Sequence, residues 1–219
     1  TGDDKQSEDV TEEDKMEPVA EPGTVDAAEE PAAQGADEID ASVWKVEDFT
    51  YTSYEKRLYG CDYSRDFTIK GSAIAGFSES GLAKLEKNKD LVLPAIDDEG
   101  DAVVGVAPSA FTKKGLTSVQ FPTGMMVDYN DTVTNGKVTK RGNFVIGENA
   151  FSGNELTSVT LPEGVIACLS NSFMGNKITT VKLPKTIWWL ETQSFGRNLI
   201  TTVNFPTTCD FQLEMHGMA

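Results

Sequence analysis

The chain has 219 residues, and its 35 acidic side chains outnumber its 19 lysines and arginines to give a formal net charge of −16. This acidity argues against a nucleic-acid partner, because phosphate contacts need clustered Lys and Arg side chains. No stretch approaches the ~20 apolar residues that a transmembrane helix requires, so we expect no transmembrane segment in this chain.

Residues 1–43 carry most of the negative charge. They hold 15 Asp and Glu residues against two lysines, and they contain no aromatic residue. A segment of this composition cannot bury enough apolar surface to fold, so we predict a disordered acidic spacer. A tail that binds a basic partner is the alternative interpretation.

Residues 44–102 differ from the spacer, because aromatic and β-branched residues gather in two runs, 49–54 and 67–74. Turn-like residues separate the runs, so the pattern predicts a β-hairpin or two edge strands. A short helix is predicted to follow, from the capping residue Ser78 to near Asn88.

In this helix we expect Leu82 and Leu85 to face inward and Lys84 to face solvent. Residues 90–94 then form a degenerate copy of the strand-and-proline pattern that recurs later in the chain. We therefore predict that residues 44–102 are an α+β N-terminal cap, which covers the apolar edge of the first repeat. An independent domain is the alternative.

From residue 103 onward the sequence repeats itself. Phe151, Phe173 and Phe195 follow one another at intervals of 22 residues, and a proline lies 11 residues after each. Phe111 has the same relation to its own proline but lies 40 residues before Phe151, which leaves room for an 18-residue insertion. A fixed period of this size predicts stacked repeats, because one unit alone cannot bury its apolar face.

Two parts of each unit are expected to line the core. Before each proline, apolar and polar residues alternate, as in a strand with one buried face. Before each phenylalanine, further apolar columns lie five and eight residues upstream, and Asn143 is the one exception. The phenylalanines predicted to form the repeat core are Phe111, Phe151, Phe173 and Phe195.

An asparagine follows the phenylalanine by three residues in the last three units, at Asn154, Asn176 and Asn198, whereas Lys114 takes this place in the first unit. Stacked side-chain amides can satisfy the free backbone groups of a buried turn, so we predict a structural ladder. Unrelated loop asparagines are the alternative.

The unit L-x-x-V-x-[LF]-P, followed by [IVL]-x-x-x-[AS]-F-x-x-N, resembles the leucine-rich repeats of the BspA-like type over roughly residues 103–210. The unit that contains Trp188, Trp189 and Arg197 departs from this pattern. The resemblance implies a mainly β repeat solenoid, a right-handed leucine-rich-repeat coil with a parallel sheet on one face. It also implies display on a bacterial surface, and binding in place of catalysis.

The insertion, at about residues 125–143, contains the dipeptide Asn135-Gly136 between β-prone residues. This pair favours a two-residue turn, so we predict a hairpin that projects from the repeats. Such arms lie beside a binding face in some repeat proteins and are decorative in others. At the C-terminal edge, Gly217 stands where the next phenylalanine belongs, and we expect either further repeats or a homodimer partner there.

Candidate catalytic or metal-binding residues are few. Cys168 and Cys209 occupy apolar columns about two repeats apart, which is too far for a disulfide, and Cys61 has no evident partner. The single histidine, His216, completes no catalytic constellation, and the acids of the repeats occupy different columns. We therefore expect no catalytic residue, metal or cofactor. A β-helix enzyme acting on polysaccharide is the rival interpretation, and it would need clustered acids or a calcium site.

The outward strand positions are predicted to form a polar face. Its candidate ligand-binding side chains are Ser158, Thr160, Thr180, Lys182, Thr202 and Asn204. Hydroxyl ladders also stabilise parallel strands, so a purely structural role is the alternative. Trp188 and Trp189 are further candidates, because exposed aromatic side chains anchor protein partners or stack on sugars.

Together with the resemblance, these features predict an extracellular, non-catalytic module of a bacterial cell-surface or secreted protein. Its expected partner is a host or bacterial surface protein or a glycan. A removed signal peptide or lipoprotein signal would leave the acidic tail as a tether to a membrane or wall. The alternatives are the β-helix carbohydrate-active enzyme and a structural spacer that displays other domains.

Overall fold

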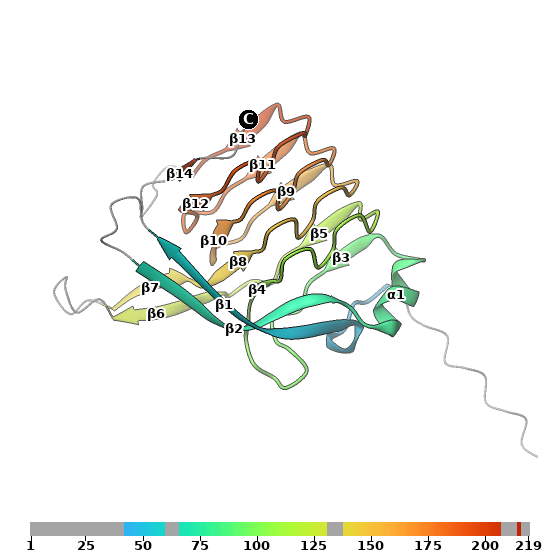
Figure 1. Cartoon of the computed structure of the whole chain (residues 1–219), viewed down its shortest axis with the longest axis horizontal. Helices are drawn as coiled ribbons and strands as arrows, with labels where there is room; N and C mark the ends of the chain where they lie inside the picture. Colours follow the sequence, from blue (N-terminus) through green and yellow to red (C-terminus); the bar gives the residue numbers. More distant parts are fainter. Residues whose placement is uncertain (1–41, 60–65, 131–137, 207–213, 216–219) are drawn as a thin grey trace, which may run out of the picture. The chain divides into compact units, whose positions relative to one another are not determined.

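The computed structural model of the chain describes residues 42–59, 66–130, 138–206 and 214–215 (Figure 1). All of them lie in the second of two compact units, Ile39–Ala219. The predicted acidic spacer therefore lies outside the described residues apart from its last two. Cys61, Cys209 and His216 also lie outside them.

The described part is mainly β with one short α-helix. Its elements in chain order are the 3₁₀-helix η1 (Val46–Asp48), β1 (Phe49–Tyr59), β2 (Asp66–Phe77), α1 (Glu79–Leu85), β3 (Asp90–Val92), β4 (Val103–Val106), β5 (Ser118–Gln120), β6 (Met126–Asn130), β7 (Val138–Gly142), β8 (Phe144–Ile146), β9 (Ser158–Thr160), β10 (Val165–Cys168), β11 (Thr180–Lys182), β12 (Trp189–Leu190), β13 (Thr202–Asn204) and β14 (Glu214–Met215).

Equivalent segments of successive repeats pair with one another in parallel. The strands that precede the prolines form a small sheet in the order β13-β11-β9, and β3 pairs with β5 in the same way. The pairing follows the repeat, because Thr180 lies opposite Ser158 on one side and Thr202 on the other. Figure 1 shows these short strands following one another along one side of the repeats.

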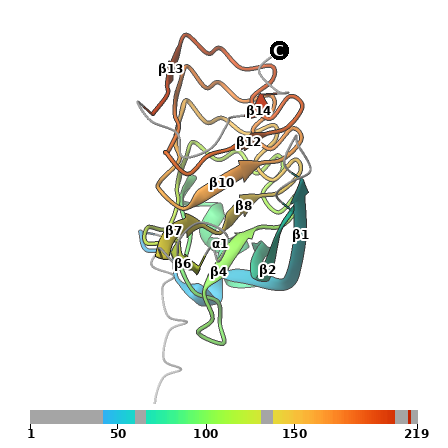
Figure 2. The same cartoon turned by 90° about the vertical axis from the view of Figure 1, so that its left-hand side faces the viewer.

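A second set of strands forms a larger sheet in the order β1-β2-β4-β8-β10-β12-β14, which is parallel from β2 onward (Figure 2). The expectation of a parallel sheet on one face is thus corrected, because parallel strands lie on both sides of the repeats. The second sheet comes from the apolar columns before each phenylalanine, such as residues 103–106 and 165–168. These runs are buried at every position, so they lack the alternation that marks a strand with one exposed face.

A register shift explains why Asn143 seems to interrupt an apolar column. Phe144, not Asn143, lies opposite Val165, and the ladder is irregular between Val165 and Ala167. Phe144 is therefore fully buried with the inner core. β8 therefore has one residue fewer than β10 over this part of the ladder, and Phe144 takes the apolar position that the period assigns to Asn143.

The inner core lies between the two sheets and contains the four repeat phenylalanines. The first hairpin joins this core at one end, because β2 pairs in parallel with β4, and Phe77 contacts Phe111 with ring centroids 4.8 Å apart. A second apolar cluster lies on the other face of the large sheet. There Tyr54 and Leu58 of β1 pack with residues of β4, β8 and β10.

α1 begins where its capping residue predicts, since Ser78 Oγ accepts a hydrogen bond from the Gly81 N–H at 3.2 Å. It ends at Leu85, three residues before the expected end. The predicted orientation of two side chains is wrong, because Leu82 is 45% exposed whereas Lys84 is buried. Lys84 turns inward to meet a buried carboxylate, a partner that helical periodicity cannot reveal.

The insertion contains an antiparallel pair, β6 with β7, in which Met126 lies opposite Gly142 and Asn130 opposite Val138. The Asn135-Gly136 dipeptide lies outside the described residues. No helix of the described residues is both long enough and apolar enough to span a membrane.

Candidate binding surface

The short strands of the small sheet present alternate side chains to solvent. The central residues Val159 and Val181 are buried, and the residues on either side point away from the core. The structure therefore brings the six predicted side chains onto one face. Ser158, Thr160, Lys182, Thr202 and Asn204 are exposed, and Thr180 is half-buried.

A further column of hydroxyls borders this face and was not among the predicted residues. Its members are Thr117, Thr157, Thr179 and Thr201, all exposed. Thr179 Oγ1 donates to the Thr157 carbonyl and Thr201 Oγ1 to the Thr179 carbonyl, each at 3.3 Å. The 22-residue period could have found the last three, since each directly precedes a residue already in the predicted face.

Charges at the margins of this surface occur close to opposite charges or to polar backbone groups. Lys177 forms an ion pair with Glu155. Glu163 Oε1 accepts a hydrogen bond from the Lys185 N–H at 3.1 Å. The face of β9, β11 and β13 is thus polar and made of short side chains, with Lys182 as the charge on the strands themselves.

Asparagine side chains tie neighbouring repeats together beneath this surface. The Asn176 amide donates to the carbonyls of Phe151 and Phe173, both at 2.9 Å, and accepts from the Leu156 N–H at 3.1 Å. Asn198 makes the same set of contacts one repeat later. Asn154 does so one repeat earlier, and its Oδ1 also accepts from the Lys114 N–H at 2.9 Å. Lys114 thus replaces the asparagine of its unit but still supplies a backbone donor.

The phenylalanines form a continuous stack. Ring centroids lie 5.4 Å apart between Phe111 and Phe151, 5.3 Å between Phe151 and Phe173, and 5.0 Å between Phe173 and Phe195. Near-parallel rings at this spacing add dispersion and quadrupole attraction to burial. The stack fixes the spacing of the repeats and hence of the polar face.

The two tryptophans lie on a different surface from the polar face. Trp189 begins β12 of the large sheet, and Trp188 directly precedes it; both are half-buried and pack against the cluster that contains Tyr54 and Leu58. Their ring centroids are 6.0 Å apart, edge to face. The predicted ligand-binding residues therefore divide between two sheets.

Cys168 is fully buried, and burial raises the pKa of its thiol far above the ordinary value, so it is a poor nucleophile. Among the residues that the structure describes, no group of three or more His, Cys, Asp and Glu side chains could hold a metal ion.

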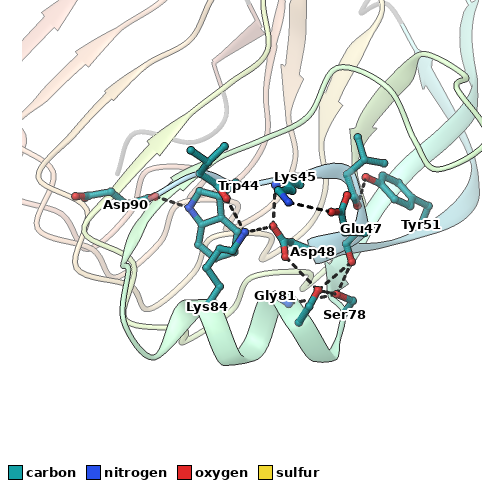
Figure 3. Close-up of polar contacts among 12 residues, drawn as sticks. Trp44, Lys45, Glu47, Asp48, Tyr51, Ser78, Gly81, Lys84 and Asp90 are labelled. Carbon is teal, nitrogen blue, oxygen red and sulfur yellow. Dashed lines mark hydrogen bonds and ion pairs between the residues drawn. The ribbon is translucent and has the colours of Figure 1, made fainter. Parts of the chain in front are cut away.

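One polar cluster has no counterpart in the sequence pattern (Figure 3). Lys84 Nζ donates to Asp48 Oδ2 at 2.5 Å, and both side chains are almost completely buried. Asp48 also accepts hydrogen bonds from the Lys45 N–H at 2.7 Å and the Ser80 hydroxyl at 3.1 Å. Burial alone would raise the pKa of Asp48, but these donors and the charge of Lys84 together hold it below its ordinary value.

Comparison with known protein families gives one match. The model of the BspA type leucine-rich repeat region matches residues 104–212 in six copies. Neither the curated proteins nor the solved structures contain a match.

Proposed function

Because residues 104–212 belong to the BspA-type leucine-rich repeat family, we propose that this chain is an extracellular, non-catalytic binding module of a bacterial cell-surface or secreted protein. Its partner is a surface protein or a glycan. Repeats of this family generally mediate recognition, and the stacked units supply a broad surface for it.

The proposal includes an architecture. The parallel pairing of equivalent segments supports a solenoid in which each 22-residue unit is one coil, and we take its right-handed sense from the family. Residues 44–102 are its N-terminal cap, and residues 125–143 are a hairpin insertion. The C-terminal edge at β13 is where a second copy pairs if the chain forms a homodimer.

One observation carries the choice of surface. The two sheets differ in what covers their outer faces, because Tyr54 and Leu58 of β1, the edge strand of the large sheet, pack against outward-facing residues of β4, β8 and β10. The small sheet instead exposes its hydroxyl, amide and amino groups. A partner that forms hydrogen bonds across several repeats fits this second face, and the asparagines and phenylalanines beneath hold it in a fixed geometry.

The first test is a glycan array and a surface-protein array probed with the whole chain and with two charge variants. Thr160→Glu lies on the polar face, and Thr68→Glu, at an exposed position of β2, is its matched control. We expect Thr160→Glu to reduce binding at least tenfold and Thr68→Glu to leave it unchanged. Equal loss in both variants would contradict the assignment of the face.

Two further experiments test whether the tryptophans bind the partner and whether the chain cleaves polysaccharides. If Trp188→Ala abolishes binding and Thr160→Glu does not, the binding site belongs to the large sheet. Incubation with polysaccharides should release no new reducing or unsaturated ends, and robust release would overturn the non-catalytic assignment. A chain that binds nothing on either array would behave as a structural spacer.

A further inference from the structure

The positive charges of the repeats gather on the side of the small sheet. Outside the insertion, the described repeats (residues 103–124 and 143–206) contain six cationic and four acidic side chains. All six cations belong to the small sheet or to the turns that lead into or out of its strands: Lys113, Lys114, Lys177, Lys182, Lys185 and Arg197. Two of the acids, Glu148 and Glu191, lie instead near Tyr54 of β1, where their charges add to burial in raising the pKa of its hydroxyl. The side of the small sheet is therefore locally positive, in a chain whose net charge is −16.

The two acids that remain on this side already have partners. Glu155 forms an ion pair with Lys177, and Glu163 Oε1 accepts a hydrogen bond from the Lys185 N–H at 3.1 Å. Within the described parts of the chain, no salt bridge joins an acid to any of the other five cations. All of these except the half-buried Lys114 are exposed. Their charges are thus available to an anionic ligand.

The side chain of Lys113 lies along the neighbouring repeat. Its backbone is in the left-handed region, with φ 54°, which glycine adopts readily and other residues do not. The equivalent residue of the next repeat is Gly153, and a Cβ there would lie 2.9 Å from Lys113 Cγ. The glycine therefore leaves room for the stem of the lysine, and one cation extends over two repeats.

Hydroxyl groups lie among these cations and recur once in each repeat. The Thr179 and Thr201 hydroxyls donate to backbone carbonyls at 3.3 Å, so each presents its oxygen lone pair as an acceptor. In the described part of the chain, no hydrogen bond uses the hydroxyls of Ser158, Thr160 or Thr180, which can both donate and accept. A ligand that itself repeats along the stack can therefore make the same hydrogen bonds at successive repeats.

A face of this composition fits a sugar polymer better than a protein or a nucleic acid. The buried centre of a protein interface is enriched in aromatic residues and depleted of Ser, and its hot spots are most often Trp, Tyr and Arg. The outward residues of the central strands are instead Ser118, Gln120, Ser158, Thr160, Thr180 and Lys182. Nucleic acids need clustered cations, whereas most of the lysines here are dispersed among hydroxyls. This pattern favours a hydroxyl-rich polymer of moderate negative charge.

We propose that the small-sheet face binds a linear acidic polysaccharide whose sugars carry carboxylate groups, laid along the repeats. Lys113, Lys182 and Lys185 pair with its carboxylates, and the Ser and Thr columns form hydrogen bonds with its hydroxyls. This inference rests on the proposed recognition function and names the chemical class of its ligand.

The test titrates the whole chain with two polyuronates of different linkage, an oligogalacturonate and an oligomannuronate. Two comparison ligands separate the two kinds of contact. The methyl esters of both polyuronates keep the sugar hydroxyls and lose the charge, whereas polyglutamate keeps the carboxylates and lacks the hydroxyls. We expect at least one polyuronate to bind about tenfold or more tightly than its ester and than polyglutamate. Its affinity should fall as salt is added, because salt screens exposed charges.

Paired variants locate the site. Lys182→Gln combined with Lys185→Gln should weaken polyuronate binding by about fivefold or more, since two exposed ion pairs are lost. Lys45→Gln combined with Lys70→Gln is the matched control, because it removes the same charge from side chains that are 59% and 73% exposed on η1's N-cap and on β2. The control should leave the affinity unchanged, and circular dichroism should show that both double variants stay folded.

Three outcomes would overturn the proposal: no binding of either polyuronate, equally tight binding of the esters or of polyglutamate, or equal losses in the two double variants. A protein or a neutral glycan that then binds in a Thr160-dependent manner would support the proposed function while this assignment of its ligand fails.

Discussion

The side-chain amide of Asn176 forms hydrogen bonds with backbone groups of two neighbouring repeats. It is buried, and it satisfies one N–H and two carbonyl groups that belong to the turns around Phe151 and Phe173. A buried backbone group that loses its partner costs about 1–3 kcal/mol. The asparagine column therefore acts as the polar counterpart of the phenylalanine stack.

We predict that Asn176→Ala lowers the free energy of unfolding by about 3 kcal/mol, because three backbone groups lose their partner. The measurement is urea unfolding followed by circular dichroism. Asn204→Ala is the matched control, since Asn204 is exposed, and it should change stability by less than about 0.5 kcal/mol. Equal effects of the two substitutions would show that the ladder contributes nothing.

The buried carboxylate of Asp48 predicts a pH dependence. Its pKa lies below the ordinary value in the folded chain. The folded state therefore gains stability from the ionised form above the unfolded pKa of about 3.9, and this gain is lost as the pH falls through the lower folded pKa. We expect the melting temperature of the wild type to fall more steeply than that of Asp48→Asn below about pH 4. Parallel curves for the two proteins would contradict this.

At the scale of the element, α1 shows where periodicity misleads. An apolar residue at Leu82 and a charged one at Lys84 predict the opposite of what the fold requires, because a carboxylate 36 residues earlier draws Lys84 inward. The cap of the same helix at Ser78 is a local signal, and the sequence was enough to locate it. A polar contact between residues far apart in the sequence cannot be predicted from the periodicity of the residues around either one.

The helix yields a direct comparison between two leucines. Leu85 is 4% exposed, so Leu85→Ala should lower the free energy of unfolding by about 2–4 kcal/mol through lost burial and a residual cavity. Leu82→Ala should change it by less than about 0.5 kcal/mol, because the side chain is largely in solvent. Chemical denaturation of both variants gives the answer, and a larger loss at Leu82 would contradict this orientation of α1.

The strands also differ in whether the pattern of apolar and polar residues predicts them. Residues 158–160 alternate in burial, which the sequence shows, whereas residues 165–168 are buried throughout and carry no alternation. The second sheet was therefore absent from the sequence-based prediction. The register shift at Phe144 also escapes a fixed period, since the chain there is one residue out of step with the column.

At the scale of the whole described region, the 22-residue period is the most informative feature of the sequence. The period alone assigns each residue to a column. That assignment was sufficient to predict the stack of phenylalanine rings and the contacts of the asparagines. The period cannot tell which face another element covers. Only the path of β1 and β2 shows that the tryptophans share a cluster with Tyr54, on a different sheet from Thr160.

The central claim is that successive repeats bond to one another in register and so hold the polar face in a fixed geometry. Native-state hydrogen exchange tests it at the amides of Phe151 and Phe173, which donate to the carbonyls of Ser172 and Ser194 at 2.7 Å. We predict that both amides exchange only through global unfolding, with the same free energy as each other. Exchange at the rate of an unstructured peptide at either position would contradict the stacking on which the recognition face depends.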